Sequence, residues 1–274
     1  MRARGLVKHY GNVCAVRGSD FEIRAGEVLA VVGDAGAGKT SLIKALSGAM
    51  VPDRGTIELD GRPVDFRGPA DARALGIETV HQALALSPQL SVFDNIYIGR
   101  RVRRPGPLGW LGMADHRRMR TAAERQLAAL GIAAIEDIRQ PASALSGSQQ
   151  QAVALARATM FGGRLIIMDE PTARLGAGEA HRVLDLIACI RDHGIPVVIV
   201  SHDMPQVFQI ADRIHIHRLG RRVALLDPAW CSMTDAVGLI TGALRLDPDG
   251  QIVQAARPAP TRVPRTAFVP MEHP

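Results

Sequence analysis

One glycine-rich loop restricts the possible folds of this chain more than any other feature of its sequence. It consists of Gly33, Asp34, Ala35, Gly36, Ala37, Gly38, Lys39 and Thr40. The apolar run Val28–Val32 precedes it, and the helix-forming residues 41–47 follow it. Glycines let consecutive backbone N–H groups converge on an anion, and the following helix directs its positive end to the same place. The alternative is a tight turn that happens to contain a lysine, but the flanking strand and helix favour a phosphate-binding P-loop.

In a P-loop, the lysine and the hydroxyl residue after it have separate tasks. Lys39 would reach the β- and γ-phosphates, and the Thr40 hydroxyl would ligate Mg²⁺. The loop therefore predicts a nucleotide-binding α/β fold.

Two later apolar runs also end in polar residues. Asp169 and Glu170 follow residues 165–168, and His202 comes shortly after Val197–Val200. Continuous apolar runs are typical of strands covered on both faces of a parallel sheet, and such sheets bind ligands beyond the carboxyl ends of their strands. We therefore expect these polar side chains and the P-loop lysine to converge on one crevice. Taken singly, the two acids are better explained as a charge pair at a helix N-terminus, and the histidine as a strand-end cap. At one sheet edge together with a P-loop, the shared crevice is favoured.

Other segments indicate two additions to this core. Residues 6–16 and 19–23, separated by Gly11 and Gly18, have the pattern of short antiparallel strands, and residues 55–59 continue that sheet. Helical periodicity predicts helices over residues 115–130, 148–160, 179–190 and about 234–240. An α-rich lobe over about residues 83–160 accounts for the first two of these helices. A strand pair is expected over residues 214–217 and 223–226.

From Asp247 onward the chain loses its periodicity and becomes rich in proline. The prolines are Pro248, Pro258, Pro260, Pro264 and Pro270. Such a composition buries too little apolar surface to fold, so we expect a disordered tail over residues 247–274.

Charge and hydropathy limit the class of protein. The formal net charge is +6, with a local group of arginines at positions 100, 101, 103, 104, 117, 118 and 120. Few aromatic residues lie nearby to stack on bases, so a solvated face is the main interpretation and contact with a membrane surface or a partner the second. No apolar run approaches the roughly 18 to 20 residues that cross a bilayer, which predicts a chain without a transmembrane segment. Cys14, Cys189 and Cys231 lack metal-ligand spacing and are expected as free thiols.

Tyr10 lies in a predicted strand ahead of the P-loop. An aromatic ring there either stacks on a base or packs against the sheet, and its position alone leaves both interpretations open.

The segment at residues 145–149 identifies a family resemblance. It reads Leu145, Ser146, Gly147, Ser148 and Gln149. This resembles the LSGGQ signature of the ATP-binding cassette (ABC) family, with serine in place of its second glycine. The order P-loop, Gln82, signature, Asp169-Glu170, His202 is similar to the family along roughly residues 5–240. The resemblance implies an ABC domain over residues 1–246, in which a P-loop core carries an antiparallel β subdomain and an α-helical subdomain.

The resemblance also implies roles for single residues. Asp169 would hold Mg²⁺ through water, and Glu170 would polarise the attacking water. Gln82 resembles the glutamine that senses Mg²⁺ and the γ-phosphate and links the site to the helical lobe. His202 resembles the switch histidine that bonds the γ-phosphate, and Tyr10 takes the adenine-stacking position. ATP would be held by the P-loop, by Ser41 and, from the opposite subunit, by Ser146, Gly147, Ser148 and Gln149.

Because the chain has one P-loop and one signature, two cassettes must meet head to tail to form two complete sites. Residues 77–82, 90–96 and 172–176 are similar to bacterial carbohydrate importers, and residues 210–222 to single-cassette members of the fructose and ribose type. This implies an ATP-hydrolysing subunit. We expect it to form a homodimer of cassettes and to be peripheral at the cytoplasmic face of the membrane.

Its expected partners are a membrane permease, docked near residues 82–98, and indirectly a periplasmic or lipid-anchored sugar-binding protein. No nucleic acid is expected. The alternatives are a soluble cassette ATPase acting on nucleic acid or ribosomes, and a weakly hydrolysing ATP-dependent regulator.

Two residues depart from the family pattern. Ser148 replaces a glycine, and it either occupies a left-handed backbone at a cost of roughly 1–2 kcal/mol or acts as a helix cap. Gly176 stands where many members carry aspartate, so a charged hydrogen bond worth about 1.5–3 kcal/mol is missing. We expect hydrolysis to survive both changes.

Overall fold

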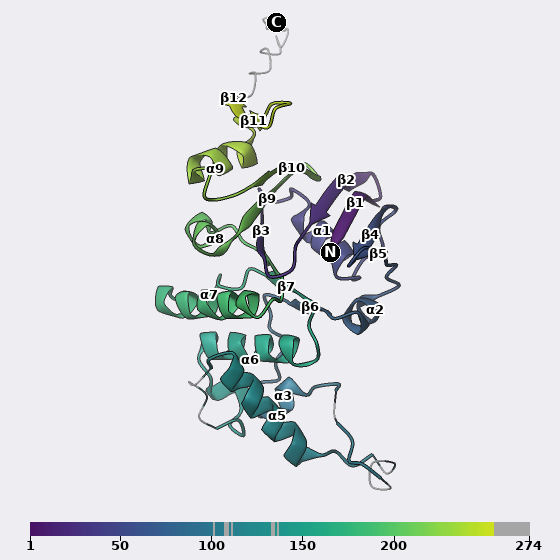
Figure 1. Ribbon diagram of the computed structural model, residues 1–274, viewed down its shortest axis with the longest axis vertical. Helices are drawn as coiled ribbons and strands as arrows, with labels where there is room; N and C mark the ends of the chain where they lie inside the picture. The colour runs from purple at the N-terminus through teal and green to yellow at the C-terminus, as the bar shows by residue number, and fades with distance from the viewer. Residues whose placement is uncertain (101, 107–109, 111, 133–134, 136, 255–274) are drawn as a thin grey trace, which may run out of the picture.

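The computed structural model describes residues 1–100, 102–106, 110, 112–132, 135 and 137–254 of the chain. A six-stranded sheet forms its centre, in the order β10-β9-β3-β8-β7-β6 (Figure 1). Five strands are parallel, namely β3 (Val28–Val32), β6 (Ile77–Val80), β7 (Leu165–Asp169), β8 (Val197–Val200) and β9 (Arg213–Arg218). The edge strand β10 (Arg221–Leu226) runs antiparallel to β9. The predicted parallel core is confirmed, because the three apolar runs lie side by side as β3, β8 and β7.

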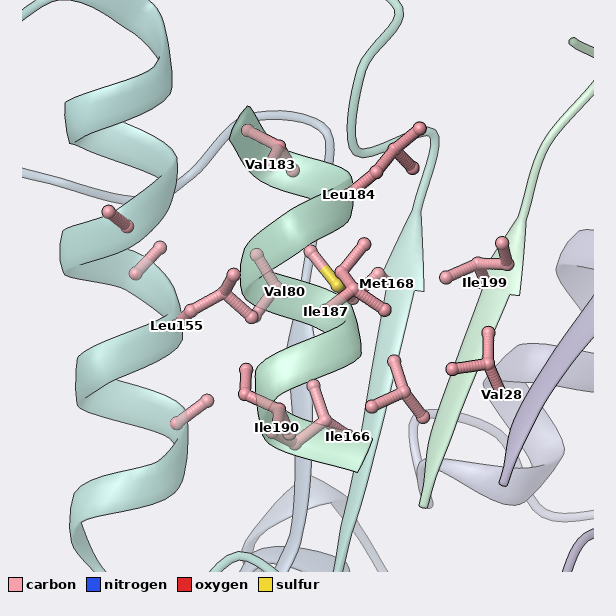
Figure 2. Close-up of a cluster of buried hydrophobic side chains, with 14 of the residues drawn as sticks. Val28, Val80, Leu155, Ile166, Met168, Val183, Leu184, Ile187, Ile190 and Ile199 are labelled. Carbon is pink, nitrogen blue, oxygen red and sulfur yellow. The ribbon is translucent and has the colours of Figure 1, made fainter. Parts of the chain in front are cut away.

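Apolar side chains cover both faces of this sheet. Val28, Ile166 and Ile199 pack toward α7 (Ala177–Asp192), which lies between the sheet and α6 (Gly147–Met160; Figure 2). On the opposite face, Leu29 and Val198 belong to a second cluster with α1 (Lys39–Leu46). Burial of each such side chain contributes about 1.5–3 kcal/mol. The sheet is therefore a rigid platform for the residues at its carboxyl edge.

An antiparallel sheet covers the α1 side, in the order β2-β1-β4-β5. Its strands are β1 (Arg2–Tyr10), β2 (Val13–Glu22), β4 (Arg54–Leu59) and β5 (Arg62–Pro63). The turn at Gly11 is confirmed, but the expected break at Gly18 is wrong. Gly18 lies inside β2, where the pairing passes from Leu6–Ser19 to Val7–Arg17 and leaves the glycine as an extra residue with φ +75°. A bulge thus stands where the sequence indicated a strand end.

The α-rich lobe is confirmed below the central sheet in Figure 1. It contains α3 (Val92–Ile96), α5 (His116–Ala129), the 3₁₀ turn Ala142–Ala144 and α6. Asp115 caps α5 by accepting a hydrogen bond from the N–H of Arg118. Met119, Ala123 and Leu127 form the buried face of α5. The shorter helices α2 (Pro69–Ala74), α8 (Met204–Ile210) and α9 (Met233–Thr241) lie outside the lobe.

A bidentate ion pair holds β9 beside the P-loop strand. Arg213 donates from Nε to Glu27 Oε1 at 2.5 Å and from Nη2 to Oε2 at 2.9 Å. The hydrogen bond to Glu27 raises the pKa of Arg213. Because Glu27 precedes β3 and Arg213 begins β9, the pair fixes the start of both strands.

The expectation of a disordered tail is wrong in part. β11 (Leu244–Leu246) pairs antiparallel with β12 (Ile252–Gln254) around a turn that Asp247 stabilises by accepting from the N–H of Gln251. The sequence shows little of this hairpin, because each of its strands is only three residues long. The tail beyond residue 254 lies outside the described residues.

The arginines expected on a solvated face differ in their exposure. Arg100 is not part of a solvated face, because it pairs with Glu78 and its guanidinium lies 4.7 Å from the centre of the Phe161 ring. Arg103, Arg104, Arg117 and Arg118 are exposed, whereas Arg101 lies outside the described residues.

The three cysteines are free thiols as expected. Within the described chain, no helix is both long enough and apolar enough to pass through a bilayer.

Candidate nucleotide-binding site

The P-loop connects β3 to α1 and is pressed against neighbouring backbone at two glycines. A Cβ at Gly33 would lie 2.0 Å from the carbonyl oxygen of His217, and one at Gly38 would lie 2.3 Å from that of Ala15. Gly38 is also the N-cap of α1 with φ +102°, a left-handed conformation that side chains rarely adopt. Both glycines are therefore required by space, and the exposed N-terminus of α1 opens onto the loop.

Lys39 lies in the first turn of α1 and folds back over the loop. Its Nζ donates to the carbonyl oxygens of Gly33 at 2.6 Å and Asp34 at 2.9 Å. Burial lowers the pKa of the ammonium, and the carboxylates of Glu170, Asp34 and Asp169 act against that shift. The predicted approach of Lys39 to the acids at the end of β7 is thus present.

Glu170 and His202 meet where β7 and β8 end. His202 Nδ1 lies 2.8 Å from Glu170 Oε1. The Glu170 side chain is 21% exposed and that of His202 74%, so the acid is recessed behind the ring. Glu170 has φ +50°, and its N–H donates to Val200 O at 2.9 Å. A left-handed backbone at a non-glycine residue costs about 1–3 kcal/mol and is concentrated at functional sites. The paired interpretation of these residues is favoured over separate caps.

Gln82 follows β6 and faces the same region from the other side. It lines a cavity of about 440 Å³ together with Glu170, Gly147 and Leu175. The Gln82 amide and the Glu170 carboxylate thus line one cavity, and the expected role of Gln82 stays a prediction.

The residues after Gln82 are tied to α6 by an arginine that the sequence analysis missed. Arg157 donates from Nη2 to Leu84 O at 2.9 Å and from Nη1 to Ala85 O at 3.1 Å. Burial lowers the pKa of this guanidinium. The sequence does contain a sign of this contact, because Arg157 is the single charged residue in the apolar stretch of residues 152–158.

The signature segment, residues 145–149, begins α6. Ser146 is the N-cap, since its hydroxyl accepts from the N–H of Gln149 while Gln149 Oε1 accepts from the N–H of Ser146. This reciprocal capping box was readable from the spacing of the two residues. A Cβ on Gly147 would lie 2.6 Å from Leu175 Cδ2, which is the end of a side chain that can rotate away.

Neither expectation for Ser148 is correct. It is the second residue of α6 and is not among the described residues with a left-handed backbone, and Ser146 rather than Ser148 caps the helix. The Ser148 side chain is buried, with Oγ 3.2 Å from Ser146 Oγ and 3.4 Å from both Glu179 Oε1 and Arg182 Nε. The hydroxyl is thus directed into a polar contact with α7.

Gly176 occupies the N-cap position of α7, with extended φ and ψ and no side-chain cap. No atom of the described part of the chain lies within 4 Å of a Cβ built there. An aspartate side chain would fit at this position. Helix α7 therefore lacks a side-chain cap because glycine has no side chain, and not because of its backbone conformation.

Tyr10 ends β1 and pairs with Val13 across the Gly11 turn. The ring is 47% exposed and lies 5.9 Å from Lys8 Nζ, so it does not pack into the core. The same hairpin brings Ala15 against Gly38 of the P-loop. An exposed ring on the hairpin that contacts the P-loop suits base stacking, which stays a prediction.

The side chains expected to hold Mg²⁺ fit that ion. Thr40 is exposed in the first turn of α1, Asp169 ends β7, and Gln82 follows β6. They offer hydroxyl, carboxylate and amide oxygen, the donors a hard cation prefers. The described residues contain no group of three or more His, Cys, Asp or Glu side chains that could enclose a metal unaided. Mg²⁺ commonly completes its shell with substrate phosphates and water, so a sparse protein donor set suits it.

Comparison with known proteins decides the family. Residues 16–173 match the ABC transporter family. This chain belongs to the ABC transporter family. The predicted family and fold class are thereby confirmed.

Two relatives place the chain within the ABC family. It is 53% identical to the fructose import ATP-binding protein FrcA of Rhizobium meliloti over 244 residues, which cover 89% of this chain and 94% of that protein. It is 42% identical to the ribose import ATP-binding protein RbsA 2 of Rubrobacter xylanophilus over 241 residues, or 88% of this chain and 45% of that protein. The chain thus spans less than half of the ribose protein.

A solved ABC cassette confirms the architecture. The ADP conformation of an ATP-binding cassette of an ABC transporter superposes with a TM-score of 0.74, covering 91% of this chain and 95% of that chain at 24% identity. This similarity concerns the fold of the cassette.

Proposed function

We propose that the chain is the ATP-binding and ATP-hydrolysing subunit of an importer for a monosaccharide of the fructose or ribose type. The contact between Glu170 and His202, at the same edge of the sheet as the P-loop, supports the proposal that the chain hydrolyses ATP. The similarity to the fructose and ribose import proteins supports the transport part. The alternatives, an ATPase acting on nucleic acid or ribosomes and a weakly hydrolysing regulator, have no such support.

Glu170 is the general base of the proposed reaction. It takes a proton from a water molecule, whose oxygen attacks the γ-phosphorus while the bond to the leaving ADP oxygen breaks. His202 orients the carboxylate through Nδ1 and leaves Nε2 free to face the γ-phosphate. Lys39 leaves the carbonyl oxygens of Gly33 and Asp34 and pairs with the phosphates. Mg²⁺, held by Thr40, Asp169 and Gln82, supplies charge neutralisation when bound.

A second copy of the chain completes each site. Ser146 and Gly147 stand at the N-terminus of α6, a 14-residue helix whose positive end suits a γ-phosphate. The family pattern brings this end to the P-loop of the opposite subunit. Two-fold symmetry then produces two equivalent sites from one P-loop and one signature in each chain.

The membrane permease docks beside residues 82–98, at a groove between the core and the helical lobe. This cavity of about 280 Å³ is lined by Arg73, Glu78, Arg100 and Arg157, among others. Arg157 joins the groove to α6, and the carbonyl groups it binds come directly after Gln82. Pressure on the groove would therefore move the signature helix and the Gln82 amide together. Docking there makes the chain peripheral at the cytoplasmic face.

Purification of the complex tests the proposal. The full chain, expressed with the membrane permease proposed as its partner, should co-purify with that permease and should release phosphate from ATP. Vesicles containing the complex and the matching sugar-binding protein should accumulate a labelled pentose or ketohexose only when ATP is supplied. Phosphate release without sugar uptake, from a chain that binds no permease, would contradict the transport part and leave the ATPase part intact.

A further inference from the structure

Two fully buried histidines lie behind the P-loop, and neither the fold nor the proposed reaction explains them. His215 and His217 point to the same side of β9, the strand that pairs with β3 through Val31 and His215. Their rings are stacked, with centroids 5.5 Å apart and an interplanar angle of 27°. Phe21 of the antiparallel sheet contacts the first ring at 5.8 Å between centroids. Apolar residues would fill this space at lower desolvation cost.

The two rings share one hydrogen bond and leave one nitrogen unpaired at each end. His215 Nε2 lies 3.3 Å from His217 Nδ1. Among the residues that the structure describes, His215 Nδ1 and His217 Nε2 have no hydrogen-bond partner. A buried, unpaired polar atom lowers the free energy of unfolding by about 1–3 kcal/mol, so the presence of two such atoms needs a functional explanation.

The unpaired Nε2 of His217 is directed at the start of α1. It lies 3.3 Å from the position that a Cβ on Gly38 would occupy, and the carbonyl oxygen of the same histidine lies against Gly33. His217 therefore touches both ends of the loop that precedes Lys39. The β9–β10 turn adds a further support, because Gly220 N donates to Ala37 O at 2.8 Å.

The charged groups around the pair require neutral rings. Burial, followed by the charge of Lys39, lowers the pKa of His217 to about 4. Burial, followed by His217 and by Arg222 of β10, lowers the pKa of His215 well below its usual value. A neutral imidazole has one N–H and one acceptor nitrogen. Nε2 of His217 can then present a lone pair to the positive N-terminus of α1.

We propose that His217 is a positioning residue of the nucleotide site: its uncharged ring, oriented by His215, supports Gly38 and the start of α1 in the form that binds phosphate. This inference rests on ATP being the ligand of the P-loop, as proposed above. His217 acts through the backbone of the loop and does not touch the phosphates. Its removal should weaken ATP binding more than it slows the bound reaction.

Substitutions of matched size separate the polar atom from the volume of the ring. His217→Gln keeps a polar group near the place of Nε2, whereas His217→Met has similar length without one. With the full chain and a fluorescent ATP analogue, we expect the Kd to stay within about threefold of the unchanged protein for Gln and to rise about tenfold for Met. The kcat at saturating ATP should differ less than threefold between the two. His215→Met should raise the Kd by a smaller factor.

Equal Kd values for His217→Gln and His217→Met would overturn the inference, as would a fall in kcat without a change in Kd. If the unchanged chain bound no ATP, the proposed function would fail as well, so the two failures are distinguishable.

A second measurement uses the unchanged protein, so that its result does not depend on whether the variants fold. In ¹⁵N spectra at pH 7, the imidazole of His217 should be neutral, and its Nε2 resonance should shift when MgADP is added. A charged ring or an unmoved resonance would overturn the inference.

Discussion

The P-loop and the signature segment are both expected to contact the same phosphate, yet they are built in different ways. At the P-loop, Gly33 and Gly38 are fixed by backbone carbonyl groups less than 2.5 Å from where their Cβ atoms would be. At the signature, Gly147 faces the end of the Leu175 side chain, and Ser148 makes hydroxyl contacts with α7. Backbone cannot move aside without disturbing the sheet, whereas side chains can rotate. The comparison explains why Gly33 and Gly38 of the P-loop cannot carry a side chain, whereas the signature accommodates a serine.

The largest expected effect comes from Gly38→Ala. The new methyl group would meet Ala15 O, and the left-handed backbone adds about 1–3 kcal/mol of strain. We expect a clear loss of unfolding free energy in urea and loss of ATP binding. Gly36→Ala is the control for stability, because its φ is +76° but no atom lies within 4 Å of its Cβ. Equal destabilisation by both variants would break the comparison.

Gly147→Ala should have a smaller effect, seen in activity and not in stability. The methyl group would displace Leu175, while alanine favours the helix by up to about 1 kcal/mol. We expect the phosphate-release rate to fall several-fold with an unfolding midpoint close to that of the unchanged protein. Gly178→Ala on α7 has open space around its Cβ and should leave the rate unaltered. A large loss of stability in Gly147→Ala would show that the signature is as rigid as the P-loop.

Ser148→Gly restores the family glycine and should change little. It removes the contacts with Glu179 and Arg182 and puts a poor helix former in the first turn of α6, at a cost of about 1 kcal/mol. The ATPase rate should remain within about threefold. Ser148→Ala, which removes the hydroxyl alone, is the matched control. A tenfold rise in rate for Gly but not for Ala would identify the serine as a brake on the site.

The smallest effect is expected at Asp53, which links β1 to the loop after α1. Lys8 donates to Asp53 Oδ1 at 2.9 Å and the N–H of His9 to Oδ2 at 2.7 Å, and these hydrogen bonds lower the pKa of Asp53 to about 2. A lowered folded-state pKa stabilises the protein above the unfolded value of 3.8, and this contribution disappears as the pH falls from there to about 2. Asp53→Asn should therefore lower the unfolding midpoint slightly at pH 7 and flatten the acid limb of the stability curve. An unchanged acid limb would contradict the assignment.

The parts of the site that follow strand ends were predictable from the sequence. The run Val28–Val32 and the two later runs specify a parallel sheet, and a parallel sheet brings Lys39, Glu170 and His202 to one edge. The spacing of Ser146 and Gln149 also signals a capping box, which was missed because Ser148 was considered as the cap.

Other features depend on contacts between distant segments, which local pattern does not contain. The position of Gly18 in a bulge follows from the register between β1 and β2. The hydrogen bonds of Arg157 to Leu84 and Ala85 join residues more than 70 positions apart. The burial of His215 and His217 is hidden for the same reason, since alternating polar residues in a strand ordinarily face solvent.

The most direct test of the central claim is phosphate release by the Glu170→Gln variant, measured beside ATP binding on the full chain with its permease. Glutamine keeps the size of the side chain and a contact with His202, but it cannot take a proton from water. We expect turnover to fall about 10²–10⁴-fold, with the ATP Kd within about threefold of the unchanged protein. Turnover retained within tenfold would contradict the assignment of Glu170 as the base.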